Sequence, residues 1–356
     1  MTKKGTIRYF FPLIIFGVLT CFRVYSSCLK KVISAACIEP TQSFFTDKEK
    51  FPGKYLSKFR EASINTAQKY LPSPHSELLI GMVMGADELS KVPSFKEALK
   101  STGTIHVVVV SGFNISLVFG FVTNLLGSKY KLKNLILAQF ITFLYSIMTG
   151  FEPPVIRALV MGSLVSWAKY YGRSLDAFRV LLFTALVMIL GWPYFLFSLS
   201  FQLSFLATLG LVVFGNFFSE KFTNFFKSES FLVEDFGTTV SAQVFVLPIV
   251  AHFFGRISIL SFLINPLILW TVPISTVLGG LFLALASISS FLATIFVQFL
   301  YPFLDVFVRL AYFFGSFKFS SVTFSANIKS MVVYYLFALL AGYLVSRRKR
   351  KIYENK

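Results

Sequence analysis

Long, nearly unbroken apolar stretches separated by short polar loops make up most of the chain from residue 77 onward. A helix needs roughly 20 apolar residues to cross a bilayer core. The candidate stretches are residues 105–126, 134–150, 154–171, 176–192, 194–216, 237–254, 257–285, 288–314 and 328–346. Another apolar stretch runs from Tyr9 to Ser26. The pattern predicts an all-α polytopic membrane protein with about ten transmembrane helices, some of them broken or interfacial.

Polar segments divide this pattern into parts. We expect an N-terminal membrane anchor, a short extracytoplasmic segment, a membrane domain and a basic cytoplasmic tail, at residues 1–28, 29–76, 77–346 and 347–356. The extracytoplasmic segment contains an amphipathic helix candidate near 55–70. The membrane domain should open with an interfacial helix near 78–84 and a short amphipathic helix at 94–101, before its first long apolar stretch.

Composition and charge placement agree with a membrane protein. Only 14% of the 356 residues are charged, against about 25% in soluble domains. The formal net charge is +18, but much of it lies in short loops and the tail, where positive charge orients a chain and contacts anionic headgroups. With an even number of spans, the basic loops at 129–133 and 169–179 and the tail fall on the side of Lys3 and Lys4. We therefore predict a multi-pass protein of the cell inner membrane with both termini in the cytoplasm.

Arg157 is the clearest charged residue inside an apolar stretch. Placing an arginine near mid-helix in a membrane costs about 2.5–3.5 kcal/mol on insertion scales. Its side chain therefore either faces a cavity or a partner, for which Glu152 is a candidate, or reaches the nearby interface.

Gln202, Gln243 and Asn265 also lie within apolar stretches. Each of these side chains needs hydrogen-bond partners at membrane depth. Singly, they favour simple links between helices; together with Arg157 they indicate a polar interior. Prolines in the same region would break helices there, which is tolerated where the backbone lines a cavity. These are Pro248, Pro266 and Pro273.

An unusual segment begins at His106, continues through four valines, and reaches Ser111, Gly112 and Asn114. Small polar residues inside an apolar stretch are typical of a broken helix whose free backbone groups face water or a ligand. The amides at a helix N-terminus bind phosphate well. The alternative is a close helix contact at Gly112, with His106 as an ordinary interfacial histidine.

Sequence signatures of catalysis are missing. The chain contains no GxxxxGK[ST] phosphate loop and no HExxH motif, and its three cysteines and three histidines form no metal-ligand pattern. Asp305 and Arg309 are spaced for a local pair one helical turn apart. We therefore predict no enzymatic activity, no catalytic residues, no cofactor and no metal.

Several segments, in order, resemble elements of the ComEC competence family. The stretch Gly103–Asn114 resembles its G-x-x-H-L-L-A-x-S-G-L-H element. The other matching segments are the lead-in 79–103, Pro153–Ala158 for P-x-x-R-A, Ser200–Ala207 for F-Q-L-S-F-x-A, and Gln243, Pro248, Phe254-Gly255 and Asn265-Pro266-Leu267 for the later Q…P…FG…N-P/L pattern. The resemblance covers roughly residues 78–275.

This resemblance implies a channel that passes single-stranded DNA into the cytoplasm during natural transformation. The residues it places on the substrate path or in its structural core are His106, Ser111, Gly112, Asn114, Arg157, Gln202, Gln243 and Asn265. Asn114 stands where the family has a second histidine, which puts any role of that imidazole in doubt.

The resemblance also bears on partners. Full-length relatives usually add an external OB-like domain and a C-terminal metallo-β-lactamase-like domain, and we expect this chain to lack the second. A DNA receptor, a nuclease and a motor ATPase would then be separate proteins, besides the lipid bilayer; the oligomeric state stays open. The alternatives are a transporter of another anionic small molecule or lipid headgroup, an intramembrane enzyme using His106 and Ser111, and an inactive truncated relative.

Overall fold

The structure is a computed structural model, and the description covers part of the chain. The described residues are 53–86, 88–108, 111–126, 132–227, 231–258, 260–317, 321–324, 327, 329–338 and 340–342. The predicted N-terminal anchor, the first part of the extracytoplasmic segment and the basic tail lie outside these residues.

Helices dominate the described residues. In chain order they are α3 (Gly53–Tyr70), α4 (His75–Met84), the 3₁₀ helix η2 (Leu89–Lys91), α5 (Pro93–Thr102), α6 (Ile105–Val108), α7 (Gly112–Leu125), α8 (Leu132–Met148), α9 (Pro153–Tyr170), α10 (Ala177–Gly191), the 3₁₀ helix η3 (Pro193–Phe197), α11 (Leu199–Phe226), α12 (Phe231–Phe254), α13 (Ser261–Leu269), α14 (Thr271–Ala286) and α15 (Ser290–Gly315). A shorter apolar helix follows at Lys329–Gly342. The all-α prediction holds apart from one antiparallel pair of short strands, β1 (Arg256–Ser258) and β2 (Ser321–Thr323), in which Ile257 is opposite Val322.

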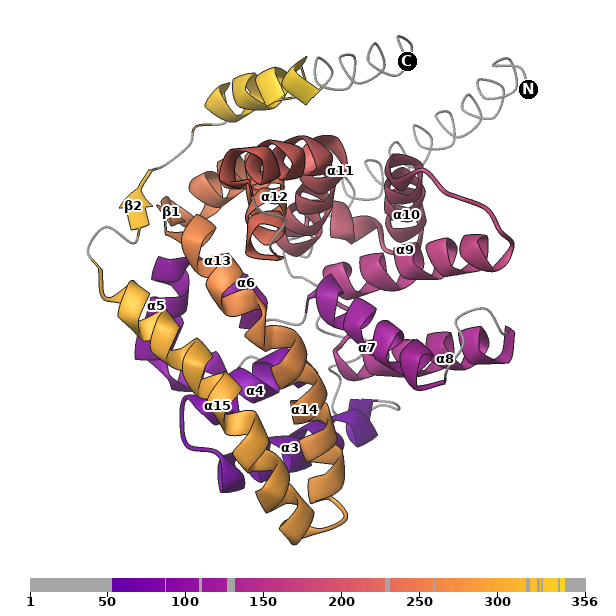
Figure 1. Cartoon of the computed structure of the whole chain (residues 1–356), viewed down its shortest axis with the longest axis vertical. Coiled ribbons are helices and arrows are strands. Elements are labelled where there is room, and N and C mark those ends of the chain that lie inside the picture. The colour runs from indigo at the N-terminus through magenta and orange to yellow at the C-terminus, as the bar shows by residue number, and fades with distance from the viewer. Residues whose placement is uncertain are drawn as a thin grey trace, which may run out of the picture.

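Helices α3 to α6 and α13 to α15 share one hydrophobic core. Side chains from α3, α4, α5 and α6 pack with side chains from α13, α14 and α15, and the buried members include Leu79, Phe95, Phe282 and Phe307. Figure 1 shows α3, α4, α5, α14 and α15 together in the lower left, while α7 to α10 lie to the right. Helices α3 to α6 and α13 to α15 therefore build one half of the molecule. Helices α7 to α12 build the other, and the helix Lys329–Gly342 packs on α11 and α12.

The middle helices have smaller cores of their own. Ile156, Met188, Phe195 and Phe201 form a cluster that joins α9, α10, η3 and α11. The longest helix, α11, packs along α12, and α7 contacts α8, α9 and α14. The two halves meet where α7 contacts α14 and where α12 contacts α13.

Helix α4 lies inside the first half rather than at an interface. All of its ten residues are buried, and it packs against α3, α14 and α15 (Figure 1). A helix that is apolar all round is expected to be buried. The predicted interfacial helix near 78–84 is therefore wrong in its location. By contrast, the amphipathic helices predicted near 55–70 and at 94–101 are confirmed as α3 and α5.

The predicted number of about ten transmembrane helices is not confirmed. Among the described residues, three helices are long and apolar enough to cross a membrane: α11, the part of α12 from Val233, and α15. A fourth span is possible if α13 and α14 count together, bent by 41° at their junction. The other predicted stretches in the described ranges form helices that are shorter or less apolar.

Breaks in the helices fall at some predicted places and not at others. The stretch 105–126 is divided into α6 and α7, and Ser111 before α7 has extended backbone (φ −101°, ψ 164°). Pro248 and Pro266, however, lie inside α12 and α13, which continue past them. The prediction that these two prolines end helices is wrong; the bend in this region falls near Trp270, between α13 and α14.

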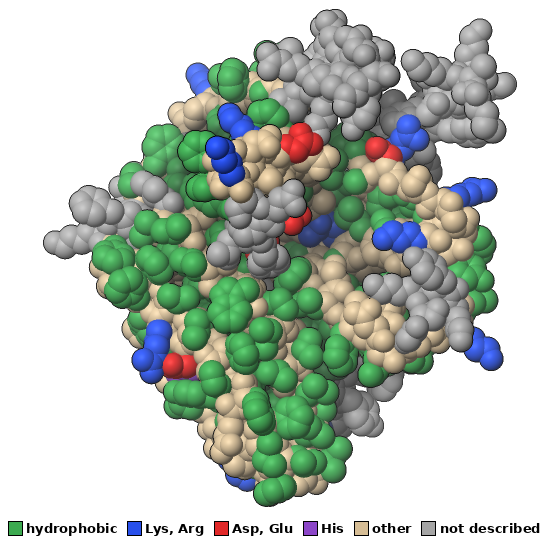
Figure 2. All heavy atoms as spheres, viewed as in Figure 1, with side chains coloured by type: hydrophobic (Ala, Val, Ile, Leu, Met, Phe, Trp, Pro, Cys, Tyr) green, Lys and Arg blue, Asp and Glu red, His purple; other side chains and the backbone are tan. Residues whose placement is uncertain are grey.

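The outer surface is rich in hydrophobic side chains. In Figure 2 they cover much of the lower half of the face, while most Lys and Arg side chains lie toward the upper part and the edges. Large exposed side chains such as Phe140 on α8, Phe183 on α10 and Phe299 on α15 contribute to this surface. Soluble proteins rarely expose apolar areas of this extent, so this surface is that expected of a protein in contact with lipid.

Candidate functional site

Arg157 connects two helices in the middle half of the molecule. Helix α9 begins with Pro153 and Pro154, which suit a first helical turn, and Arg157 follows one turn later. Its Nε donates a hydrogen bond of 2.7 Å to Ser204 Oγ on α11, and its Nη1 donates to Thr208 Oγ1 one turn further along α11. Two neutral hydroxyl groups therefore hold the guanidinium between α9 and α11.

The first residue of α7 lies against this guanidinium. A Cβ atom added to Gly112 would be 3.0 Å from Arg157 Nη2 and 3.1 Å from the Pro154 carbonyl oxygen. The close helix contact that the sequence left open at Gly112 is therefore present. Because free amides and the helix dipole make a helix N-terminus attractive to anions, α7 and Arg157 together present positive charge to one place.

Glu152 is not the partner of Arg157. Among the described residues no ion pair involves Arg157, and Glu152 instead interacts electrostatically with Arg60 of α3. Burial raises the pKa of the Glu152 carboxyl, and the attraction of Arg60 opposes this rise. The candidate pair from the sequence is therefore wrong, and the Arg157 charge is not neutralised by a carboxylate in the described part of the chain.

Carbonyl oxygens at the C-terminal end of α4 accept hydrogen bonds from two other helices. Asn114 Nδ2 on α7 donates to the Met82 oxygen at 2.9 Å, and the Tyr145 hydroxyl on α8 donates to the Val83 oxygen at 3.1 Å. The last carbonyl groups of a helix have no partner within that helix. In this chain, Asn114 therefore connects α7 to the buried helix α4.

Arg60 of α3 contacts two helix ends. Its Nη2 donates to the carbonyl oxygens of Met84 at 3.4 Å and Met148 at 3.2 Å, which are the last residues of α4 and α8. A cation is favourable at a helix C-terminus, where the helix dipole is negative. Arg60 therefore ties α3 to the C-terminal ends of α4 and α8.

A second set of polar residues, the Gln243 group, consists of Gln243, Ser261 and Asn265 and lies where α12 meets α13. Gln243 Nε2 donates to Ser261 Oγ at 2.9 Å, and Ser261 Oγ donates to the Ser258 carbonyl oxygen at 2.8 Å. Asn265 lies one helical turn after Ser261 and is buried. Gln243 Oε1 and Asn265 Oδ1 are buried acceptors without a hydrogen-bond partner among the residues described. This group can therefore accept further hydrogen bonds at these two oxygen atoms.

The turn before α6 packs on this second group. A Cβ atom on Gly103 would lie 2.9 Å from Ser261 Cβ, and Gly103 has a φ of +73° that favours glycine. His106 Nδ1 lies 2.9 Å from the Gly103 carbonyl oxygen, and its side chain is exposed. Gly103, just before α6, therefore contacts the Gln243 group, and Gly112, at the start of α7, contacts Arg157.

Gln202 takes no part in either group. Its Nε2 donates to the Leu196 carbonyl oxygen at 3.1 Å, six residues earlier in the chain. This bond fixes η3 to the first turn of α11, which is a local structural role. Of the predicted site residues, the structure thus brings Gly112 to Arg157, gives His106 a contact with the Gly103 carbonyl oxygen, and leaves Gln202 apart.

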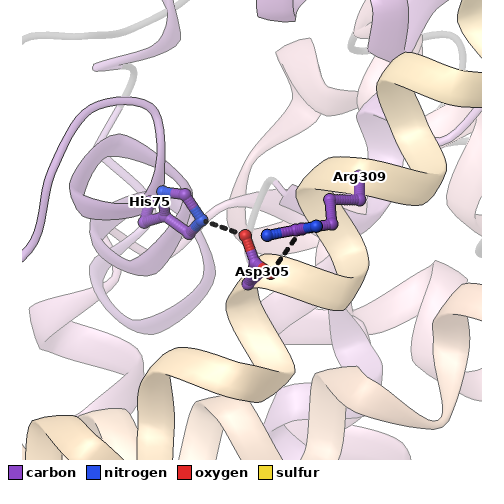
Figure 3. A network of polar contacts seen from close by, with 3 residues as sticks. All are labelled: His75, Asp305 and Arg309. Carbon is purple, nitrogen blue, oxygen red and sulfur yellow. Dashed lines mark hydrogen bonds and ion pairs between the residues drawn. The ribbon is translucent and has the colours of Figure 1, made fainter.

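A charged network in the first half contains one predicted pair and one unexpected member. Arg309 Nε and Asp305 Oδ2 on α15 are 2.6 Å apart, which confirms the predicted pair one turn apart. Asp305 Oδ1 also lies 3.3 Å from Nε2 of His75, the first residue of α4 (Figure 3). The imidazole stacks on the Tyr301 ring at a centroid distance of 4.8 Å. The network joins α4 to α15.

The sequence interpretation overlooked several of these contacts. A helical-wheel argument could have found Thr208, since it lies four residues after Ser204 and therefore on the same face of α11. Arg60, Tyr145 and His75 gave no such signal, because their partners are far away in sequence and are mostly backbone atoms. Within the described ranges, no group of three or more His, Cys, Asp and Glu side chains could hold a metal ion.

Comparison with protein families and with known proteins finds one family model and two relatives of low identity. A family model described as competence protein matches residues 82–349. The chain is 27% identical over 231 residues to ComE operon protein 3 of Bacillus subtilis (strain 168), covering 62% of this chain and 28% of that protein. It is also 27% identical over 172 residues to an uncharacterized protein of Aquifex aeolicus (strain VF5), covering 48% of this chain and 41% of the relative. The match thus spans less than half the length of either relative. No solved structure matches.

Proposed function

The chain belongs to the competence protein family, and from this premise we propose that it forms the path by which one DNA strand crosses the cell inner membrane during natural transformation. The similarity to ComE operon protein 3 supports this proposal. The surface rich in exposed hydrophobic side chains and the long apolar helices support a location in a membrane.

The observation that carries the proposal is the environment of Arg157. Its guanidinium is bound by the hydroxyl groups of Ser204 and Thr208 and lies against the first residue of α7, Gly112. Keeping an arginine inside a membrane protein costs free energy, so an arginine that is retained there usually marks a functional site. A cation held by neutral groups beside a helix N-terminus is suited to a phosphate, because arginine and free amides are common phosphate ligands. Arg157 would therefore meet the backbone of the passing strand.

The Gln243 group is suited to a different part of the strand. The free acceptor atoms Gln243 Oε1 and Asn265 Oδ1 can receive hydrogen bonds from the exocyclic amino groups of bases or from water that accompanies the strand. They carry no charge, so they would contribute no attraction for phosphate. In this proposal the strand passes both groups.

Energy and strand processing would come from other proteins. We propose that both termini are cytoplasmic, as the basic loops favour, and that this chain is a passage and not an enzyme. A motor ATPase would drive transport, a receptor would deliver the DNA outside, and a nuclease would remove the other strand.

Uptake of labelled DNA in a deletion strain tests the proposal. The strain would be complemented with the wild type, with Arg157→Gln or with Arg309→Gln, at equal protein levels. Arg309 is the matched control, because it is an arginine in an apolar helix whose charge is paired with Asp305. We expect Arg157→Gln to lower uptake about tenfold or more, the effect of losing roughly 1.4 kcal/mol of interaction, and Arg309→Gln to leave it nearly unchanged. Normal uptake in the deletion strain would reject the role in DNA transport.

A further inference from the structure

Three buried polar atoms on two neighbouring helices have no hydrogen-bond partner among the residues described. They are Asn114 Oδ1 on α7 and the hydroxyl oxygens of Ser275 and Thr276 on α14. The three residues are only 0%, 1% and 4% exposed. An unpaired buried polar group costs roughly 1–3 kcal/mol, so three of them in one region indicate that a ligand completes their hydrogen bonding or coordination.

The two hydroxyl groups differ from the other buried hydroxyl groups on helices. Thr142, Thr184 and Ser241 each donate to the carbonyl oxygen four residues earlier, at 2.7, 2.8 and 2.6 Å. Ser275 and Thr276 do not form such bonds. Their oxygens are therefore free to bind something other than their own helix.

Contacts along α14 place these hydroxyl groups on the side that faces α4. A Cβ atom on Gly279 would meet the side chains of Leu79 and Val83 on α4. Ser275 and Thr276 are four and three residues before Gly279, so they lie on the same face of α14, one turn earlier.

The direction of α14 then decides which end of α4 they approach. Phe282, after Gly279 on α14, packs edge to face on Tyr70 at a centroid distance of 5.9 Å, and Tyr70 ends α3 shortly before α4 begins. The later part of α14 is thus near the start of α4. Ser275 and Thr276, on the earlier part, therefore lie toward the C-terminal end of α4.

Asn114 approaches the same end of α4 from the other side. Its Nδ2 donates to the Met82 carbonyl oxygen at 2.9 Å, while its Oδ1 has no partner. Helix α7, which carries Asn114, also contacts α14. The three residues therefore lie on the sides of α7 and α14 that face the C-terminal end of α4.

The chemistry of this place fits a small cation. The ligands available are the neutral side-chain oxygens and the second lone pairs of the α4 carbonyl oxygens that already accept from Asn114, Tyr145 and Arg60, and hard cations prefer oxygen ligands. Divalent cations are usually bound through carboxylates, and within the described ranges no cluster of acidic side chains and histidines could hold one. In membrane transporters, the C-terminal ends of short or broken helices commonly coordinate sodium.

We propose that Asn114 Oδ1, Ser275 Oγ and Thr276 Oγ1, with backbone carbonyl oxygens at the C-terminal end of α4, form a binding site for a monovalent cation, with sodium as the preferred ion. The site holds α7 and α14 together at the contact between the two halves of the molecule. It does not depend on the proposed passage of DNA.

Thermal unfolding of the purified full-length protein in detergent tests the site. Sodium chloride would be titrated against choline chloride at constant ionic strength. At saturating sodium we expect Tm to rise by about 4 °C, because an ion that binds only the native state stabilises that state against unfolding. In Ser275→Ala/Thr276→Val this sodium-dependent rise disappears. The same variant has an unchanged or higher Tm in choline chloride, because it loses two unpaired buried hydroxyl groups, so a failure to fold is not confused with a loss of binding.

Thr184→Val serves as the matched control. It also removes a buried hydroxyl group from an apolar helix, but one that is bonded within its own helix, and it should keep the full sodium effect. The proposal is overturned if sodium and choline give the wild type the same Tm, which would leave a bound water as a sufficient partner. It is equally overturned if Ser275→Ala/Thr276→Val keeps the sodium-dependent rise.

Discussion

Arg157 Nε on α9 donates a 2.7 Å hydrogen bond to Ser204 Oγ on α11, so a neutral side chain, and not a carboxylate, holds this partly buried cation. A hydroxyl group satisfies the donor but does not cancel the charge. A buried charge that is not paired is expensive, and replacing it with an apolar side chain would remove the cost. The arrangement is therefore better explained by binding of an anion than by stability alone.

The contact between Gly112 and Arg157 should tolerate no side chain. Gly112→Ala places a Cβ atom 3.0 Å from Arg157 Nη2 and 3.1 Å from a backbone oxygen that cannot move easily. We expect the free energy of unfolding to fall by about 1–3 kcal/mol, the usual cost of overpacking.

Gly120→Ala on the same helix is the control for this prediction. Nothing lies within 4 Å of a Cβ atom there, so the better helix propensity of alanine should raise stability by about 0.5–1 kcal/mol. Chemical denaturation of both variants measures the difference. Equal effects of the two substitutions would mean that α7 does not approach α9 at Gly112.

The Tyr145 hydroxyl group should contribute to stability through one backbone atom. Tyr145→Phe keeps the ring but leaves the Val83 oxygen at the end of α4 without this donor, whose bond is 3.1 Å long. We expect a loss of about 1–2 kcal/mol, the cost of an unpaired buried acceptor, seen as a lower Tm. Tyr171→Phe, whose ring is largely exposed, should change Tm little. A Tm for Tyr145→Phe equal to that of the wild type would show that water replaces the hydroxyl group.

The two charged residues of the Asp305–Arg309 pair should contribute unequally to the stability of the protein. Asp305 is mostly buried and contacts both His75 and Arg309, whereas the Arg309 side chain is 78% exposed. Exposed ion pairs contribute about 0–1 kcal/mol, so Arg309→Gln should cost little. Asp305→Leu should cost more, because it removes the partner of the buried His75 imidazole. If Arg309→Gln destabilised the protein as much as Asp305→Leu, the contact between α4 and α15 would not depend on His75.

Glu152 should make stability depend on pH. Burial is the larger cause and raises the pKa of its carboxyl above the ordinary value of about 4.3, while Arg60 opposes the rise. The folded protein therefore holds this proton more tightly than the unfolded chain, and stability falls as the pH rises from the ordinary value through the folded-state pKa. Glu152→Gln should lack this fall. Parallel Tm curves for the two proteins from acid to neutral pH would contradict the assignment.

The sequence predicted features that depend on neighbouring residues. The division of 105–126 at Ser111 follows from small polar residues within an apolar stretch, and the Asp305–Arg309 pair follows from helical spacing. The amphipathic helix at 94–101 could also be predicted from the sequence, since its polar and apolar positions alternate with the helical period.

Features that depend on distant residues were not predictable in this way. The ten residues of α4 are too few to cross a bilayer, which suggested an interface, yet packing by α3, α14 and α15 buries them completely. Glu152 is five residues before Arg157, but in the structure it interacts electrostatically with Arg60, which is far away in the sequence. Pro248 lies in α12 without ending it, because packing along α11 supports the helix on both sides of the proline.

Photo-crosslinking of transforming DNA is the most direct test that a strand passes the N-terminus of α7 beside Arg157. A benzophenone side chain would replace Phe113, an exposed residue next to Gly112, and as a control Phe140, an exposed residue on α8. The proposed path predicts that labelled DNA caught during uptake becomes attached at position 113 and not at position 140. Attachment at neither position, or equally at both, in cells that take up DNA normally would contradict it.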